Sequence, residues 1–322
     1  MKSLLAIVFA LVLAAPSWAA DEHALDPAKL RLASHNVLIL DADGDSPIYA
    51  KGADEVTPIA SVTKLMTAMV VLDAQQPLDE MLEVDMRDFD FLKGSSSRLR
   101  IGATLSRREM LRLALMASEN RAASALARYY PGGTQAAVSA MNAKAQLLGL
   151  SHTHYDDPTG LNPGNVSTAS DLAHLVKAAA EYPLIREFTT TPSQYVQIEG
   201  TNQTLGFNNS NPLVKNDKWD IMLQKTGYIR EAGKCLVMLA NIASKPVVIV
   251  LLDSLGKYTR VADAQRIKHW LETGEPMPAS VIAARTPHGG IKAAAANAKL
   301  KHHRPRGSFP SRVAKNGRSG NS

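Results

Sequence analysis

The runs KCLVMLAN (residues 234–241) and PVVIVLLD (residues 246–253) decide the fold of this chain. Both are nearly continuous apolar stretches, rich in Val, Leu and Ile, that are short enough for strands and are separated by a short turn. A third run, WDIMLQK (residues 219–225), precedes them. We expect the three runs to form an antiparallel meander, followed by a closing amphipathic helix over residues 258–271.

The beginning of the chain supplies two more strands. HNVLILD (residues 35–41) has the pattern of a buried strand, and PIYA (residues 47–50) returns antiparallel after a turn rich in Asp and Gly. Between the two groups of strands the chain is Ala-rich and predicts helices. They begin near Ser106 and cover about 119–130, 134–148 and 168–181. The pattern predicts an α+β fold, an antiparallel sheet flanked by helices with a helical lobe inserted over about 77–190.

Three short polar motifs occur within this framework. They are Ser61-Val-Thr-Lys64, Ser118-Glu-Asn120 and Lys225-Thr226-Gly227. The first opens an apolar run, so on a helix its hydroxyl and amine project from one turn, whereas the third lies at the end of a predicted strand. A serine hydroxyl needs a neighbouring base, and a lysine amine serves as one only when its pKa is lowered. Ser254 and Lys257 repeat the first spacing, but no companion motif follows them.

This ordered set resembles the signature of the serine penicillin-binding proteins and class A β-lactamases. The resemblance covers about residues 35–272 and implies a β-lactamase-like D,D-peptidase fold with no cofactor and no metal. It implies that Ser61 forms an acyl-enzyme, that Lys64 is its base, kept neutral by burial and by Lys225, and that Ser118 relays the proton. The substrate-binding residues that it implies are Asn120, Lys225, Thr226, Gly227 and Tyr228. The oxyanion would lie between the backbone N–H groups of Ser61 and Tyr228.

The segment after the second motif distinguishes the branches of this group. Residues 121–180 contain no glutamate, so the deacylating residue of class A β-lactamases is absent. DDPTGLN (residues 156–162) instead resembles the D-alanyl-D-alanine peptidases, which act on peptidoglycan stem peptides and are acylated by β-lactams. Their carboxypeptidases usually carry a further β-rich domain, for which the chain has no room. This short form and the segment KTGYIREAGKC (residues 225–235) make the chain most similar to the periplasmic murein D,D-endopeptidases. The alternative is a D-alanyl-D-alanine carboxypeptidase.

We expect both ends to lie outside the peptidase domain, which is assigned to residues 20–274. Residues 1–19 combine a basic start, an apolar core and small residues at Ser17 and Ala19, and predict a cleaved signal peptide and a periplasmic location. Residues 275–322 predict a basic, disordered tail. From residue 285 onward it has nine Lys or Arg and no acidic residue, so the rest of the chain carries −3 of the total +6. The tail either attaches weakly to membrane or wall or only aids solubility, and nucleic acid is a poor partner for an exported chain.

Three rival interpretations can be tested against a structure. His152 and His154 with Asp156 and Asp157 are zinc-ligand types, but a third ligand at recognisable spacing is missing. Cys235 is a potential nucleophile, although its place in an apolar strand indicates packing. A catalytically idle wall-binding module would keep the fold, but the polar residues of all three motifs are intact. We also predict that removing residues after 274 leaves turnover of soluble substrates unchanged.

Overall fold

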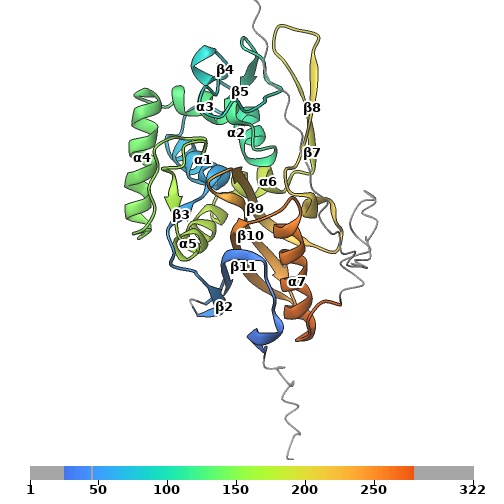
Figure 1. Ribbon diagram of the computed structural model, residues 1–322. Coiled ribbons are helices and arrows are strands. Elements are labelled where there is room, and N and C mark those ends of the chain that lie inside the picture. Colours follow the sequence, from blue (N-terminus) through green and yellow to red (C-terminus); the bar gives the residue numbers. More distant parts are fainter. Residues whose placement is uncertain (1–24, 45, 279–322) are drawn as a thin grey trace, which may run out of the picture.

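The computed structural model describes residues 25–44 and 46–278. The predicted signal peptide and the tail beyond residue 278 lie outside the described residues, so both stay predictions. A five-stranded antiparallel sheet organises the chain, with helices on both of its faces (Figure 1). The predicted α+β class is therefore confirmed.

The sheet has the strand order β2-β1-β11-β10-β9, and each neighbouring pair is antiparallel. Its strands are β1 (Ser34–Asp41), β2 (Pro47–Lys51), β9 (Asp220–Ile229), β10 (Gly233–Ile242) and β11 (Lys245–Ser254). Because β1 pairs with both β2 and β11, the first and last strands of the chain lie side by side. This agrees with the expectation that both ends of the chain complete one sheet.

Successive side chains of the buried strands point to opposite faces of the sheet and pack into two separate cores. Leu236 and Met238 of β10 pack with Trp270 of α7 (Thr259–Thr273), which covers one face of the sheet. Val237, which points to the opposite face, belongs to a larger core shared with the remaining helices. Burial on both faces explains why the strand runs are almost continuously apolar.

The helices between the two groups of strands lie where the Ala-rich pattern predicts them. They are α2 (Arg107–Met116), α3 (Asn120–Arg128), α4 (Gly133–Leu147) and α5 (Ala169–Ala180). Helix α6 (Pro183–Thr190) is an addition that the sequence did not predict. Pro183 occupies its first turn, where the missing backbone N–H costs nothing, so this proline begins a helix as well as ending the segment before it.

Short elements connect this framework. They are β3 (Thr57–Pro58) with β6 (Val166–Ser167), β4 (Met81–Glu83) with β5 (Thr104–Ser106), the hairpin β7 (Ser193–Gln197) and β8 (Thr204–Asn208), and the 3-10 turns η1 (Pro27–Lys29), η2 (Ala60–Thr63), η3 (Met86–Asp88) and η4 (Pro212–Lys215). The β7–β8 hairpin extends away from the sheet beside the lobe (Figure 1).

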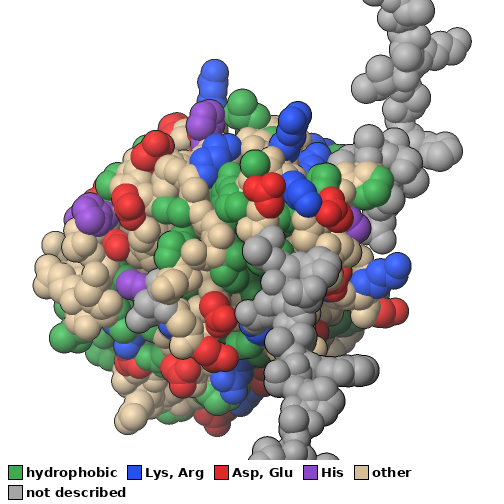
Figure 2. Space-filling model, turned by 90° about the horizontal axis from the view of Figure 1, so that it is seen from below, with side chains coloured by type: hydrophobic (Ala, Val, Ile, Leu, Met, Phe, Trp, Pro, Cys, Tyr) green, Lys and Arg blue, Asp and Glu red, His purple; other side chains and the backbone are tan. Residues whose placement is uncertain are grey.

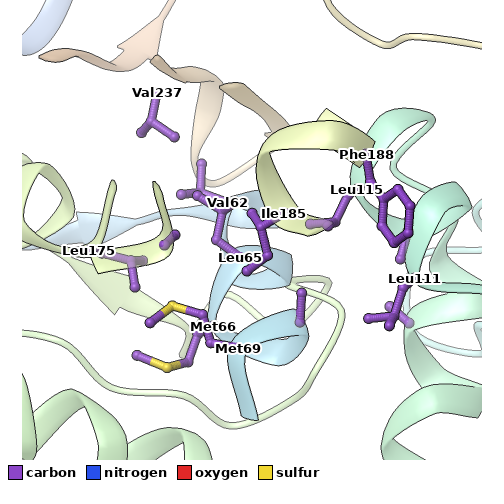
Figure 3. Close-up of a cluster of buried hydrophobic side chains, with 14 of the residues drawn as sticks. Val62, Leu65, Met66, Met69, Leu111, Leu115, Leu175, Ile185, Phe188 and Val237 are labelled. Carbon is purple, nitrogen blue, oxygen red and sulfur yellow. The ribbon is translucent and has the colours of Figure 1, made fainter. Parts of the chain in front are cut away.

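Helix α1 (Lys64–Asp73) lies at the centre of the larger core. All of its residues from 64 to 71 are buried. In Figure 3, Leu65, Met66 and Met69 of α1 are surrounded by side chains from other elements. The labelled neighbours are Val62, Leu111, Leu115, Leu175, Ile185, Phe188 and Val237. Because residues 64–71 are buried around the whole circumference of the helix, the backbone that follows Ser61 is firmly held.

Within residues 25–44 and 46–278, we find no helix with both the length and the apolar character that crossing a membrane requires. On the face drawn in Figure 2, acidic and basic side chains alternate and do not gather into one charged patch. The excess positive charge of the chain therefore does not mark this face as a surface for a polyanion.

Candidate active site

A pocket of about 450 Å³ brings all three sequence motifs together. It opens where the outer strand β9 meets η2 and the lobe. Its lining includes Ser61 of the first motif, Ser118 and Asn120 of the second, and Thr226 and Gly227 of the third. Segments that are far apart in the sequence thus converge on one cavity, as the resemblance implied.

Ser61 and Lys64 start the central helix in a manner slightly different from the sequence prediction. Ser61 lies in the 3-10 turn η2 and Lys64 is the first residue of α1, so the hydroxyl and the amine do not share the first turn of one α-helix. They nevertheless meet, with Lys64 Nζ 2.8 Å from Ser61 Oγ. The preceding residue, Ala60, has φ of 47°, an unusual backbone conformation for a residue with a side chain.

Lys64 Nζ contacts two further acceptors besides the serine. They are Asn120 Oδ1 at 2.7 Å and the carbonyl oxygen of Thr159 at 2.5 Å. A neutral amine has two N–H donors and one lone pair. If Asn120 and Thr159 take the two donors, the lone pair faces Ser61 Oγ, which is the orientation that a base for this hydroxyl needs.

The pKa of Lys64 is lowered from 10.5 to about 8. Burial is the main cause, because the low-dielectric interior disfavours the ammonium, while the negative charges of Asp157 and Glu119 oppose the shift. The predicted like-charge interaction between Lys64 and Lys225 is present. It lowers the pKa of Lys225, which burial and then the charges of Lys64 and Arg260 hold well below its usual value.

Ser118 lines the pocket and contacts the buried Lys225. Lys225 Nζ donates to Ser118 Oγ at 2.9 Å and to the carbonyl oxygen of Thr226 at 2.8 Å. Ser118 lies between α2 and α3 with φ of 60°, a conformation that costs energy for any residue except glycine and that clusters at functional sites. The Thr226 hydroxyl is 2.6 Å from Ser210 Oγ, which orients it at the pocket surface.

The third motif lies inside a strand and not at its end. β9 continues to Ile229, so Lys225, Thr226 and Gly227 belong to the regular sheet, contrary to the sequence expectation. A Cβ at Gly227 would lie 2.9 Å from the carbonyl oxygen of Ile59 and 3.2 Å from the backbone nitrogen of Ser61. Glycine is needed here because β9 passes directly against the backbone of η2. Tyr228, the next residue, lines the pocket with an exposed side chain.

The loop of residues 156–165 supports the first motif, and sequence reasoning gave it no role. Its Asn165 is fully buried and bonds with Thr63 Oγ1 at 3.0 Å and with the backbone of Asp157. Asp157 in turn accepts from the N–H of Gly160 at 2.7 Å. This network holds the Thr159 carbonyl against Lys64. A backbone carbonyl has no side-chain signal, although the segment DDPTGLN was noticed for its resemblance.

The rival sites are not assembled in this fold. His154 pairs with Asp156 at 2.9 Å on the surface, whereas Asp157 points into the loop. Among the residues that the structure describes, no group of three or more His, Cys, Asp or Glu side chains could hold a metal ion. Cys235 is fully buried, and burial raises the pKa of its thiol to about 11, so it is packed as an inert side chain.

Comparison with known proteins identifies the group to which this arrangement belongs. A family described as D-alanyl-D-alanine carboxypeptidase matches residues 22–256. The chain belongs to this family. It is 51% identical to a D-alanyl-D-alanine endopeptidase of Pseudomonas aeruginosa over 80% of this chain and 84% of that protein. It is 47% identical to a D-alanyl-D-alanine endopeptidase of Escherichia coli, over 87% of this chain and 90% of that protein.

A solved structure shares the fold of this family member. The Streptomyces DD-transpeptidase superposes with a TM-score of 0.71 at 28% identity, over 76% of this chain and 98% of that chain. The β-lactamase-like D,D-peptidase fold implied by the three motifs is thereby confirmed, and the chain is a serine peptidase of this family.

Proposed function

We propose that this protein is a serine D,D-endopeptidase that cleaves the cross-bridges of peptidoglycan, between a D-alanyl carbonyl and the amine of a diamino acid. The observation that carries the proposal is the contact of Ser61 Oγ with a Lys64 amine whose pKa lies near 8, at the base of a pocket that also contains Ser118 and Thr226. A nucleophile with its own base is the minimum requirement for acyl transfer.

Acylation begins with the transfer of the Ser61 proton to Lys64 as Oγ forms a bond to the D-alanyl carbonyl carbon. Asn120 and the Thr159 carbonyl hold the amine so that its lone pair faces the hydroxyl. The developing oxyanion lies between the backbone N–H groups of Ser61 and Tyr228, and each such donor typically contributes about 100-fold to 1,000-fold in rate. The close approach of Gly227 to Ser61 supports this placement, because it brings β9 beside η2.

The tetrahedral intermediate then releases the amine half of the substrate. Ser118 relays to the departing nitrogen the proton that Lys64 took from Ser61, so the C–N bond breaks, Lys64 is neutral again and the ester to Ser61 remains. A water molecule then attacks this ester and gives its proton to Lys64, which returns it to Ser61 Oγ as the ester bond breaks. Asn120 hydrogen-bonds the substrate amide. Lys225 and Thr226 bind the carboxylate of the leaving residue, and that anion favours the charged form of Lys225, which has no ion-pair partner among the described residues.

Penicillin acylation tests the nucleophile directly. Treatment with a penicillin should add one drug mass to the intact protein, and Ser61→Ala should remove the adduct. The matched control is Ser254→Ala, which alters the other Ser-x-x-Lys sequence, at a buried position on β11. An adduct that survives Ser61→Ala would contradict the proposed nucleophile.

The endopeptidase assignment rests on the relatives. The two that are 51% and 47% identical are D-alanyl-D-alanine endopeptidases, whereas the carboxypeptidase of Bacillus subtilis is 30% identical. Purified protein should convert cross-linked muropeptide dimers to monomers. Release of D-alanine from pentapeptide monomers without cleavage of dimers would favour the carboxypeptidase alternative.

The proposal also includes a place of action. Peptidoglycan lies outside the cytoplasmic membrane, and the predicted signal peptide would deliver the enzyme to the periplasm, where cutting cross-bridges affects cell shape. Attachment of the basic tail to membrane or wall is part of the same proposal. Fractionation of cells that express the full chain and a chain ending at residue 274 would test both points, since attachment requires the shorter form to be released.

A further inference from the structure

Three cations gather beside the pocket where β9, β10 and α7 meet, and the motifs account for none of them. This basic cluster consists of Lys234, Lys257 and Arg260. Arg260 lines the pocket and donates to the carbonyl oxygens of Gly227 at 2.7 Å and Cys235 at 3.2 Å. Lys234 lies opposite Tyr228 in the β9–β10 pair, with Nζ 3.7 Å from the centre of the tyrosine ring.

The members of the basic cluster are close enough to interact unfavourably. The pKa of Lys234 is lowered first by partial burial and then by the charges of Arg260 and Lys257. Repulsion between gathered like charges is relieved when an anion binds among them. The cluster is thus a place where a carboxylate would be stabilised by more than one cation.

No carboxylate of the described chain, residues 25–44 and 46–278, forms an ion pair with any member of the basic cluster. Two other lysines differ in this respect. Lys93, which also lines the pocket, pairs with Glu231 at 2.6 Å, and Lys268 of α7 pairs with Glu272. Arg230, which lines the pocket beyond Ile229, forms no ion pair with a described residue either, so unpaired positive charge borders the pocket on both sides of Tyr228.

The direction of β9 indicates which half of a substrate meets these cations. In the proposed function, Lys225 and Thr226 bind the carboxylate of the leaving residue, and the scissile carbonyl lies at Tyr228. The leaving half therefore extends from Tyr228 towards Thr226, past Gly227, whose carbonyl oxygen accepts a hydrogen bond from Arg260. The acyl half extends the other way along β9, towards Ile229 and Lys93.

The two candidate substrates differ most in the leaving half. A terminal D-alanine leaves with a single carboxylate, which Lys225 and Thr226 already bind. A cross-bridge leaves as a whole second stem peptide that carries further carboxylates. Resting on the proposed D,D-peptidase function, we infer that Lys234 and Lys257 bind a further carboxylate of this second stem and thereby favour cross-linked substrates over single stems.

The experiment compares Lys234→Gln, Lys257→Gln and the double variant, since glutamine keeps most of the side-chain length and removes the charge. For cross-linked dimers, kcat/KM of the double variant should fall roughly tenfold, mostly through KM, because each partly exposed charge pair contributes a few-fold. Release of D-alanine from pentapeptide monomers and acylation of Ser61 by penicillin should change by less than about twofold. Lys218→Gln, an exposed lysine before β9, is the matched control and should leave all three rates unchanged.

A chemically altered substrate identifies the carboxylate as the group that is recognised. Amidating the free carboxylates of the second stem, except the one that Lys225 and Thr226 bind, should slow the wild type as much as the double variant is slowed on the natural dimer. It should have no further effect on that variant. Equal losses on dimers and monomers, or no loss on dimers, would overturn the inference. If the wild type does not cleave dimers, the proposed function fails. The role of the cluster can still be decided by calorimetry, which measures binding of the intact dimer to Ser61→Ala protein with and without the two lysine substitutions.

Discussion

Replacement of Gly160 by alanine tests whether the loop of residues 156–165 positions the nucleophile. A Cβ at this position would lie 2.0 Å from the carbonyl oxygen of Ala60 and 2.8 Å from the backbone nitrogen of Ser61. Real Cβ atoms essentially never approach other heavy atoms closer than 3.0 Å, so the loop and η2 must separate by about 1 Å. Both sides of this contact are backbone, and no side chain can rotate away to relieve it.

The expected effects on stability and on activity have different sizes. Gly160 has φ of 79°, and a residue with a side chain in that region costs about 1–2 kcal/mol, to which overpacking adds about 1–3 kcal/mol. A displacement of about 1 Å at a catalytic group lowers the rate roughly 100-fold. Gly160→Ala should therefore acylate roughly 100-fold more slowly with penicillin than the wild type, at temperatures where it is still folded.

The assay is the second-order rate constant for labelling by a fluorescent penicillin, with circular dichroism to establish that the variant is folded. Gly200→Ala is the matched control, because Gly200 has a similar φ of 69° but no heavy atom within 4 Å of the added Cβ. It should lose about 1–2 kcal/mol of stability and no acylation rate. A folded Gly160→Ala protein that acylates at the wild-type rate would refute the argument that this loop positions Ser61.

Three further predictions follow from the same contacts. The acylation rate constant, measured by stopped flow, should rise about tenfold per pH unit below pH 8 and level off above it. The reason is that Lys64 accepts a proton only when neutral, and its pKa is about 8. A midpoint near pH 10.5 would contradict the effect of burial. Asn165→Ala should lower the free energy of unfolding in urea by about 2–4 kcal/mol because it leaves buried polar partners unsatisfied, while the exposed Asn202→Ala should change nothing measurable. Cys235 should react with a thiol reagent at pH 8 only after unfolding, since it is buried with a pKa of about 11, and rapid reaction of the native protein would argue against this packing.

The sequence was informative where a few neighbouring residues carry the signal. The strands β10 and β11 follow from long apolar runs, and the members of each motif are so close in the sequence that local structure places them together. Meeting of the three motifs in one pocket was predicted only through the family resemblance. The spacing of residues within each motif does not indicate the distance between Ser61 and Thr226 in the fold.

Other features depend on contacts that no short pattern records. The Thr159 carbonyl acts through its backbone, so its side chain gives no indication of the role. The β7–β8 hairpin is largely exposed, and its apolar alternation is too weak to predict. The extent to which Lys64 is buried also depends on distant segments that pack around the start of α1, so the size of its pKa shift cannot be derived from the helix itself.

The position of β1 between β2 and β11 has a consequence for how the enzyme matures. One edge of β1 pairs with β2, but its other edge can pair only after β11 has been synthesised. Such long-range pairing is slow to form. Pocket residues on β9 depend on the same final step, because β9 joins the sheet through β10 and β10 through β11. A chain that ends before Lys245 would lack the strand that links its two halves, so covalent labelling by penicillin reports completed and folded molecules and does not count fragments.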